Sequence, residues 1–592
     1  MILAQCCSLS VLKQCGRCRS IHLFLLQCIL SSVFTMMAKQ RSSLAVLPRA
    51  EVIAYWVLSL GSHLYSFYQL HIVSKEYEAG LEREFQLKKG FLIWGYKKDP
   101  TDFEWSFWSH WAWKSLLWTL LGHAWVSKLA SVFVAKFRVT VLTAYGLMVA
   151  CSALGIKGVG VVLAHLVVSL AVAQLRRPTL SWSCALLLLS TLHIPQLQDI
   201  QRSWYQTEEE YYLLLFSVAV CSLRFISFSL EHCWHPLEAG GLQGQLYWLT
   251  AYSFYHPLFY NGPILTFKDF LQQMQVPVTV HGGRTTCFSL LTRAGRICVW
   301  WLIAEYMIHM MYMHTIQANE TYLEILPPWA LGGLALALVQ FFFVKYLVLF
   351  GVPSLLAELD GLAPPKLPRC VSIMHSFTGM WRHFDVGLYH WLIRYIYVPL
   401  GGSRHGLLWK MLSTALVFGF VCLWHGGHDY LQCWALMNWL GVLVENGLDI
   451  LFSSPLICPL TERFISPAMR RRCLALLSAF STAMLILSNL VFLGGNHVCR
   501  IMWKRVFIQG WCTVAPPMLA FLYCFAQIGL EWESAPPVTH RPLERKENPA
   551  YLPPHPGAVC GDHTTPTVVI LRKETKRQAS LPVIPAKEST GA

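Results

Sequence analysis

Long apolar runs without Asp, Glu, Lys or Arg recur along this 592-residue chain, separated by short polar connections. Four of them cover Val52–Ser74, Met411–His428, Leu474–Cys499 and Val506–Leu530. Each reaches the roughly 18 residues that a helix needs to cross the hydrocarbon of a bilayer. Short alternating segments, which are typical of a membrane barrel, are rare. The pattern predicts an all-α polytopic membrane protein.

The same pattern predicts roughly ten to twelve membrane-embedded helices. Some runs are short, and the stretch Tyr247–Phe267 is broken by Asn261-Gly262-Pro263, so we expect some of these helices to be re-entrant. The predicted helices lie near residues 52–72, 111–133, 139–155, 158–175, 180–194, 211–229, 288–315, 329–353, 408–428, 430–447, 474–496 and 506–530.

The two ends of the chain differ from the apolar middle. Residues 1–46 are basic and then apolar, which predicts an accessory extension in front of the membrane domain at 47–533. Residues 534–592 are rich in Pro, charge and small polar side chains. Such a segment cannot bury a core, so we expect a disordered tail.

Composition and charge support the membrane class. The chain is 55% hydrophobic and 13% charged, whereas soluble domains are about a quarter charged. The net charge of +15 would suggest nucleic acid in a soluble protein, but here Lys and Arg occupy short loops such as Lys97-Lys98 and Arg176-Arg177. This distribution follows the positive-inside rule. We therefore expect a lipid bilayer and no nucleic acid as the partner.

His425 ends a charge-free run and is followed by Gly426-Gly427. Three interpretations stay open from the residues alone. The histidine could cap a helix end at the membrane interface, or act as a general base beside a substrate, because neutral imidazole suits proton transfer near pH 7. It could also bind a metal with His428 and Asp429.

Asp385 lies forty residues before His425, in a segment with Trp391, Leu392, Tyr395 and Ile396 at helical spacing. It could pair with Arg382 or Arg394. Alternatively, a carboxylate across a cavity from a histidine could orient that histidine or hold an amine.

Glu305 and His309 are four residues apart in another apolar run, which also carries His314. Their spacing predicts either a proton relay or a polar contact between helices.

Several blocks of the sequence resemble the membrane-bound O-acyltransferase (MBOAT) family, and within it the branch that acylates Hedgehog signalling proteins. The resemblance covers about residues 47–533 and leaves both ends outside. It is carried by Trp424-His425-Gly426-Gly427 with Asp385 upstream, and by the blocks Leu64–Tyr68, Lys98–Trp108, Gly262–Leu265, Phe377–Arg382 and Ser488–Asn496.

This resemblance implies an MBOAT-type bundle around a transmembrane tunnel, in a multi-pass protein of the endoplasmic reticulum, with the Golgi as a second compartment. The implied reaction transfers palmitate from palmitoyl-CoA to the N-terminal cysteine amine of Hedgehog signalling proteins. His425 would be the general base and Asp385 would position the amine. Trp381 and Asn489 would line the acyl-CoA channel, and Cys370 would ligate the iron of haem b.

Three other functions stay open at this stage. The chain could be a catalytically inactive acyltransferase-like scaffold or a lipid O-acyltransferase of the same superfamily. A transporter is the third alternative, although the sequence lacks the internal repeats expected of one.

Overall fold

The computed structural model describes residues 45–90, 96–237, 240–276, 287–452, 454 and 463–534. The predicted extensions at 1–46 and 534–592 lie outside the described residues, except for Ala45, Val46 and Ser534. The described part is almost entirely helical, which confirms the all-α class. Its two strands, β1 (Lys88–Lys89) and β2 (Lys97–Lys98), form one antiparallel pair.

The first half of the described chain runs from α4 to α14. Its helices are α4 (Arg49–Glu76), α5 (Glu78–Phe85), α6 (Phe103–Trp111), η1 (Ala112–Leu116), α7 (Leu117–Phe133), η2 (Ala135–Phe137), α8 (Arg138–Ala173), α9 (Pro178–Ser190), η3 (Thr191–His193), α10 (Pro195–Arg202), α11 (Glu208–Trp234), α12 (Gly241–Ser253), α13 (His256–Phe259) and α14 (Phe267–Met274).

The second half contains the residues that the sequence singles out. Its helices are α15 (Cys287–Met310), α16 (Met313–Ala318), α17 (Glu320–Ile325), α18 (Pro328–Leu359), η4 (Val371–Ile373), α19 (Phe377–His383), α20 (Val386–Leu392), η5 (Ile393–Tyr397), α21 (Leu407–Trp424), α22 (Asp429–Phe452), α24 (Pro467–Trp503), η6 (Lys504–Gln509) and α25 (Ala515–Ser534).

Six segments of the described residues are long and apolar enough to cross a membrane, or seven if the bent pair Pro178–His193 and Pro195–Arg202 forms one span. The sequence predicts two spans at 139–155 and 158–175. Both lie in α8, whose two helical parts meet at a kink at Gly155, where the backbone is non-helical (φ 69°, ψ 169°). The multi-pass class is therefore supported by the structure. The total of ten to twelve embedded helices stays a prediction.

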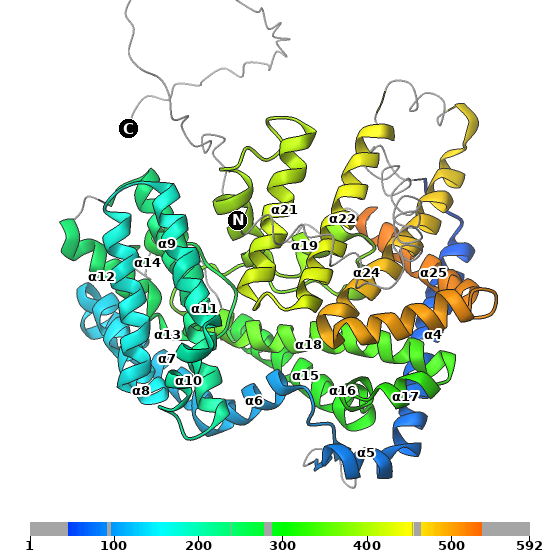
Figure 1. Cartoon of the computed structure of the whole chain (residues 1–592), viewed down its shortest axis with the longest axis horizontal. Helices are drawn as coiled ribbons and strands as arrows, with labels where there is room; N and C mark the ends of the chain where they lie inside the picture. Colours follow the sequence, from blue (N-terminus) through cyan, green and yellow to red (C-terminus); the bar gives the residue numbers. More distant parts are fainter. Residues whose placement is uncertain are drawn as a thin grey trace, which may run out of the picture. The chain divides into compact units, whose positions relative to one another are not determined.

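Helix α18 lies at the centre of the packing (Figure 1). It contacts α4, α15 and α24, and shorter helices such as α13 and α16. Its buried side chains, from Ala330 to Leu347, belong to the largest hydrophobic cluster of the described residues. A helix that is apolar on nearly every side is expected in the core of a membrane bundle.

The stretch Tyr247–Phe267 is broken, as its Pro and Gly residues predict. Helices α12 and α13 are separated at Phe254 and Tyr255, and the chain is irregular from Tyr260 to Thr266. Buried Arg224 of α11 donates hydrogen bonds to the carbonyls of Tyr252 (3.0 Å), Ser253 (2.7 Å) and Leu258. Irregular backbone at membrane depth is tolerated when such groups satisfy its carbonyls.

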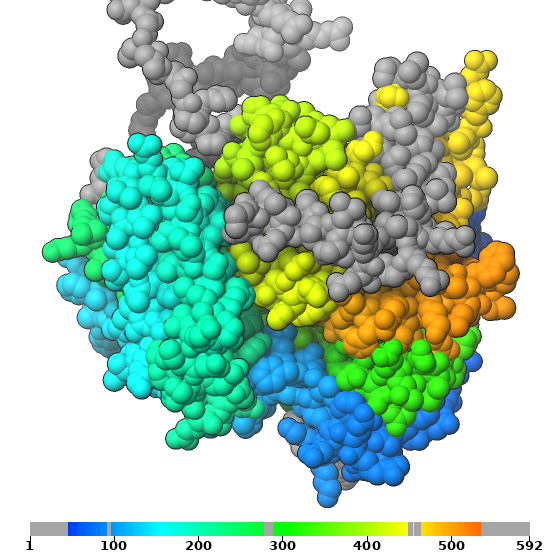
Figure 2. Space-filling model, viewed as in Figure 1, coloured from blue at the N-terminus to red at the C-terminus, as the bar shows by residue number. Residues whose placement is uncertain are grey.

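Helix α6 joins the two halves of the bundle. In Figure 2 the blue surface around α6 lies beside the teal surface of α10 and α11. The rings of Phe103 and Tyr212 meet there with their centroids 4.7 Å apart. Phe107 also packs against Tyr212, at 5.3 Å. These contacts fix the start of α6 relative to α11, and this start carries two carboxylates of the site described below.

Arg471 of α24 ties the first described residues to the last helix. Its side chain is only 2% exposed, and it donates hydrogen bonds to the Ala45 carbonyl (3.1 Å), Gln527 (3.2 Å) and Glu531 (2.6 Å). Next to it, Arg472 pairs with Glu51 of α4 at 2.7 Å. A buried guanidinium needs such partners to offset its lost hydration. The two arginines therefore hold α4, α24 and α25 together.

We expect Arg471→Met to destabilise the purified protein by about 1–3 kcal/mol, because three hydrogen-bond acceptors lose their donor. Thermal unfolding in detergent should show a lower Tm than the wild type. Arg404→Met is the matched control, because Arg404 is exposed and its side chain forms no hydrogen bond or ion pair among the described residues. Equal unfolding temperatures for both variants would contradict the proposed role of Arg471.

Candidate active site

His425 lies where α21 ends, at a sharp reversal of the chain. Its backbone N–H is directed at the carbonyls of Val421 and Leu423, so the residue closes the helix. Gly426 and Gly427 follow with φ angles of 115° and 69°, which are strained for residues with a side chain. Helix α22 begins two residues later. The interpretation of His425 as a helix cap is correct for its backbone.

The imidazole of His425 has a different environment from its backbone. Its ring centroid lies 4.7 Å from Trp424, 5.4 Å from Phe492 and 6.3 Å from Trp434, with all three rings close to edge-on. The residue nevertheless stays exposed. A histidine that is exposed and surrounded by aromatic rings can contact a ligand in an apolar environment.

The structure does not support a metal site at His425. His428 and Asp429 are exposed, and the ring of His428 stacks on Tyr430 at 5.9 Å. Across the described ranges, no three His, Cys, Asp or Glu side chains gather as metal ligands would. General-base chemistry is therefore the interpretation that the surroundings of His425 favour.

Trp381 of α19 belongs to the same aromatic cluster as His425. Its ring lies 5.7 Å from Trp434, which also contacts His425. The indole N–H of Trp381 donates to Asn438 Oδ1 at 3.0 Å, and the Asn438 amide donates to Ser488 Oγ at 2.7 Å. This chain of hydrogen bonds fixes the indole relative to α22 and α24.

Asp385 is the N-cap of α20, and its Oδ1 accepts the N–H of Leu388 at 2.9 Å. The predicted alternative of a pair with Arg394 is wrong, because Arg394 binds Glu231 of α11 through two hydrogen bonds of 2.5 and 2.9 Å. Arg382 is exposed, and among the described residues it forms no ion pair with Asp385. The carboxyl is therefore left without a cationic partner in the described part.

Aromatic side chains connect Asp385 with His425, which do not form a hydrogen bond with each other in the described structure. Phe384 stacks on Phe342 of α18 at 5.2 Å, and Phe342 meets Phe492 at 5.9 Å. Phe492 in turn contacts His425. Since Asp385 does not hold the histidine, the interpretation in which it receives an amine is the one that stays open.

Asp385 lies between the spans formed by α18 and α21. Loss of water around this half-buried carboxyl raises its pKa to about 6, partly offset by the backbone N–H groups of Leu388 and Gly387. The group is therefore mostly ionised at neutral pH and close to its titration range. Such a carboxylate could bind an incoming ammonium without the competition of a permanent ion pair.

Asn489 lies in a different environment from Trp381. It lines a mainly apolar cavity together with Gln340 of α18, Phe525 of α25, and Val371 and Ser372 from the segment that follows Cys370. The structure thus brings Trp381 together with His425, whereas it places Asn489 near the Cys370 segment.

Cys370 is half-buried and packs against the cluster around α18. A cysteine thiolate is one of the protein groups that can ligate haem iron. Cys370 is the residue that would hold such a group, and within the described ranges no group of three His, Cys, Asp or Glu side chains gathers as metal ligands.

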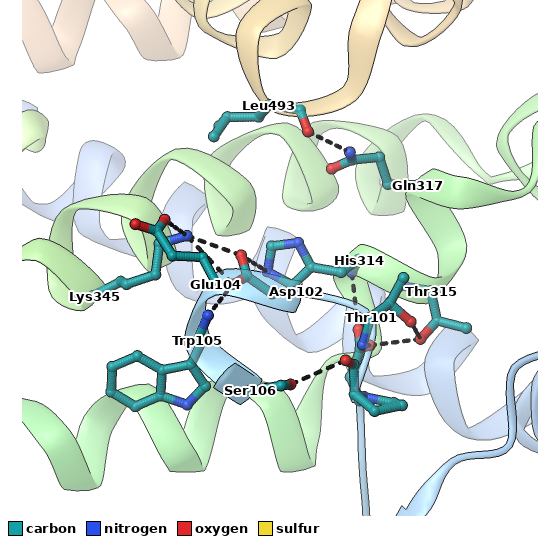
Figure 3. A network of polar contacts seen from close by, with 12 residues as sticks. Thr101, Asp102, Glu104, Trp105, Ser106, His314, Thr315, Gln317, Lys345 and Leu493 are labelled. Carbon is teal, nitrogen blue, oxygen red and sulfur yellow. Dashed lines mark hydrogen bonds and ion pairs between the residues drawn. The ribbon is translucent and has the colours of Figure 1, made fainter. Parts of the chain in front are cut away.

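A buried ionic network between α6 and α18 was not anticipated from the sequence. Lys345 of α18 is 4% exposed, and its Nζ lies 3.0 Å from Asp102 Oδ2 and 2.8 Å from Glu104 Oε2 (Figure 3). Tyr346 donates its hydroxyl to Glu104 Oε1 at 3.1 Å. The sequence feature that could have indicated this network is Lys345 itself, because a lysine inside the apolar run 329–353 needs a partner.

Glu305 of α15 makes polar contacts between elements, which was one of the two interpretations of Glu305 and His309. Glu305 accepts hydrogen bonds from Lys98 and from the indole of Trp105, each at 3.0 Å. His309 stays within its own helix, where its Nδ1 lies 2.6 Å from the backbone carbonyl of Glu305. Glu305 therefore holds α15 against Lys98 and the start of α6.

Comparison with known proteins decides the class of this site. The sequence profile described as "MBOAT, membrane-bound O-acyltransferase family" matches residues 170–488, just over half of the chain, including Asp385 and His425. The chain belongs to the membrane-bound O-acyltransferase family. As a member of this family of acyltransferases, it is a multi-pass membrane protein, and the transporter alternative has no support.

Three relatives refine this comparison. Mouse "Protein-cysteine N-palmitoyltransferase HHAT" is 49% identical over 493 residues, which cover 82% of this chain and 99% of that protein. Mouse "Protein-cysteine N-palmitoyltransferase HHAT-like protein" is 27% identical over 490 residues, covering 82% and 95%. Drosophila melanogaster "Protein-cysteine N-palmitoyltransferase Rasp" is 28% identical over 321 residues, covering 54% and 62%.

We expect Asp385→Asn to remove most acyl transfer without loss of folded protein. The asparagine Oδ1 can still accept the N–H of Leu388, so the cap of α20 persists while the charge is lost. Turnover and the yield of monodisperse protein should be measured together, with binding of acyl-CoA as a third readout. A fall in yield with normal turnover of the surviving molecules would show that Asp385 is structural.

Proposed function

We propose that this enzyme transfers palmitate from palmitoyl-CoA to the N-terminal cysteine amine of Hedgehog signalling proteins, at the membrane of the endoplasmic reticulum or Golgi. The observation that carries the proposal is the 49% identity to mouse HHAT over 99% of that protein. The described site agrees in its chemistry, since it offers an accessible imidazole and a carboxyl without a cationic partner. We assign the activity to residues 47–533.

The proposed reaction is aminolysis of a thioester. The substrate nitrogen attacks the thioester carbonyl, a C–N bond forms, the C–S bond breaks, and CoA leaves with its sulfur. Asp385 binds the substrate as its ammonium, which loses one proton to solvent before the attack, and then orients the amine. His425 takes the second proton, which the nitrogen loses as the C–N bond forms, and returns it to the departing CoA thiolate. Such orientation can contribute several kcal/mol to lowering the barrier.

The separation of the two residues supports a division of roles. Among the described residues, His425 and Asp385 form no ion pair with each other, and the rings of Phe492, Phe342 and Phe384 connect them. The aromatic wall between them would exclude water from the thioester. Trp381 and Asn489 would line the acyl-CoA channel on different sides, Trp381 near His425 and Asn489 near the Cys370 segment.

A catalytically inactive scaffold is the main rival. The relative named HHAT-like is 27% identical to this chain, far below the 49% of the relative named HHAT. This difference favours the active enzyme.

We expect His425→Ala to insert into membranes normally and to lose roughly 100-fold or more of its acyl transfer, the usual contribution of a general base. The assay uses labelled palmitoyl-CoA and a peptide with the N-terminal cysteine of a Hedgehog protein. His428→Ala is the matched control, because His428 is exposed and only three residues away. Unchanged turnover of His425→Ala would remove this residue from the mechanism.

Cys370 is the residue that would hold a haem b iron through its thiolate, and no step of acyl transfer passes through that group. We expect purified protein to show a Soret absorption band, and Cys370→Ala to weaken or remove it. Half-buried Cys473 of α24 supplies the control Cys473→Ala. Absence of the band from protein produced with sufficient haem would refute this assignment.

A further inference from the structure

The buried network of α6 and α18 is linked through Tyr346 to Phe384, the residue that precedes Asp385. Lys345 binds both Asp102 and Glu104, and all three side chains are less than one-fifth exposed (Figure 3). Asp102 is also the N-cap of α6, where it accepts the N–H of Trp105 at 2.6 Å. Because each carboxylate has both a cation and a fixed backbone or side-chain partner, the network is a rigid support.

Tyr346 connects this support with the segment that carries Asp385. Its hydroxyl donates to Glu104, while its ring lies 6.0 Å from the ring of Phe384, at an interplanar angle of 61°. Phe342, one turn earlier on α18, stacks on Phe384 at 5.2 Å and also contacts the Tyr346 ring at 4.8 Å. The two α18 rings therefore hold the residue that immediately precedes Asp385.

Asp385 is fixed on its other side by the cap of α20. Its Oδ1 is bound to the N–H of Leu388, so the position of the carboxyl depends on where Phe384 holds the backbone. A shift of the Tyr346 ring would consequently move the carboxyl away from a bound amine.

We propose that Tyr346 is a positioning residue for acyl transfer, which holds Asp385 in place through Phe384 and is itself held by Glu104 and Lys345. This inference rests on the proposed function, because it assigns Asp385 the role of receiving the substrate amine. Tyr346 acts on the amine through Asp385 and does not take part in proton transfer.

The test compares Tyr346→Phe in two backgrounds, wild type and Asp385→Asn, in purified full-length protein. Removal of one hydrogen bond should lower kcat for transfer to the peptide by about threefold to tenfold. The KM for palmitoyl-CoA and the slow hydrolysis of palmitoyl-CoA without peptide should stay unchanged, since neither involves the amine. In the Asp385→Asn background the same substitution should cause no further loss.

Tyr145→Phe is the matched control. Tyr145 of α8 also donates its hydroxyl to a single acceptor, the Thr119 carbonyl at 2.7 Å, in a separate part of the bundle. Its removal should leave the transfer rate as in the wild type. An equal loss from Tyr346→Phe in both backgrounds, or no loss in either, would overturn the inference.

Glu104→Gln provides a second route if Tyr346→Phe gives too little folded protein. It keeps the size of the side chain and leaves Asp102 to pair with Lys345. It should lower kcat in the wild-type background alone, and additive losses would again overturn the inference. If the wild type itself fails to acylate the peptide, the proposed function fails. If the wild type is active and Tyr346→Phe equals it, only the role of Tyr346 fails.

Discussion

The structure depends on one constraint, which is that each charge buried in the bundle must find its partners within the protein. Lys345 binds two carboxylates, Arg224 binds three carbonyls, and Arg471 binds Glu531, Gln527 and the Ala45 carbonyl. Each of these cations joins elements that are distant in the sequence. The pairing of charge therefore sets which helices are neighbours, while apolar packing fills the space between them.

Local features of the sequence were sufficient to predict the helices and part of the site. The charge-free runs mark the apolar helices, and His425 is recognisable because it ends such a run before two glycines. The break in the helix around Asn261-Gly262-Pro263 was also predicted from its residues. The division of α8 was predicted as well, because the predicted spans 139–155 and 158–175 separate near Gly155, where the backbone is non-helical.

Long-range contacts explain what the sequence could not predict. Asp102 and Lys345 are 243 residues apart, and no local pattern indicates that they pair. Arg394 lies close to Asp385 in the sequence, yet it binds Glu231, which is 163 residues away. Glu231 thus occupies Arg394, and exposed Arg382 forms no ion pair with Asp385, so Asp385 has no cationic partner among the described residues. Competition of this kind is decided by three-dimensional packing.

The positive φ angles of Gly426 and Gly427 have a consequence for how sequence variants of this enzyme are interpreted. Any other L-residue at these positions would strain the turn that presents His425 to the site. A variant there would have the phenotype of an active-site lesion although it changes no reactive atom. Screens of natural variation should therefore treat both glycines as equivalent in severity to the histidine they follow.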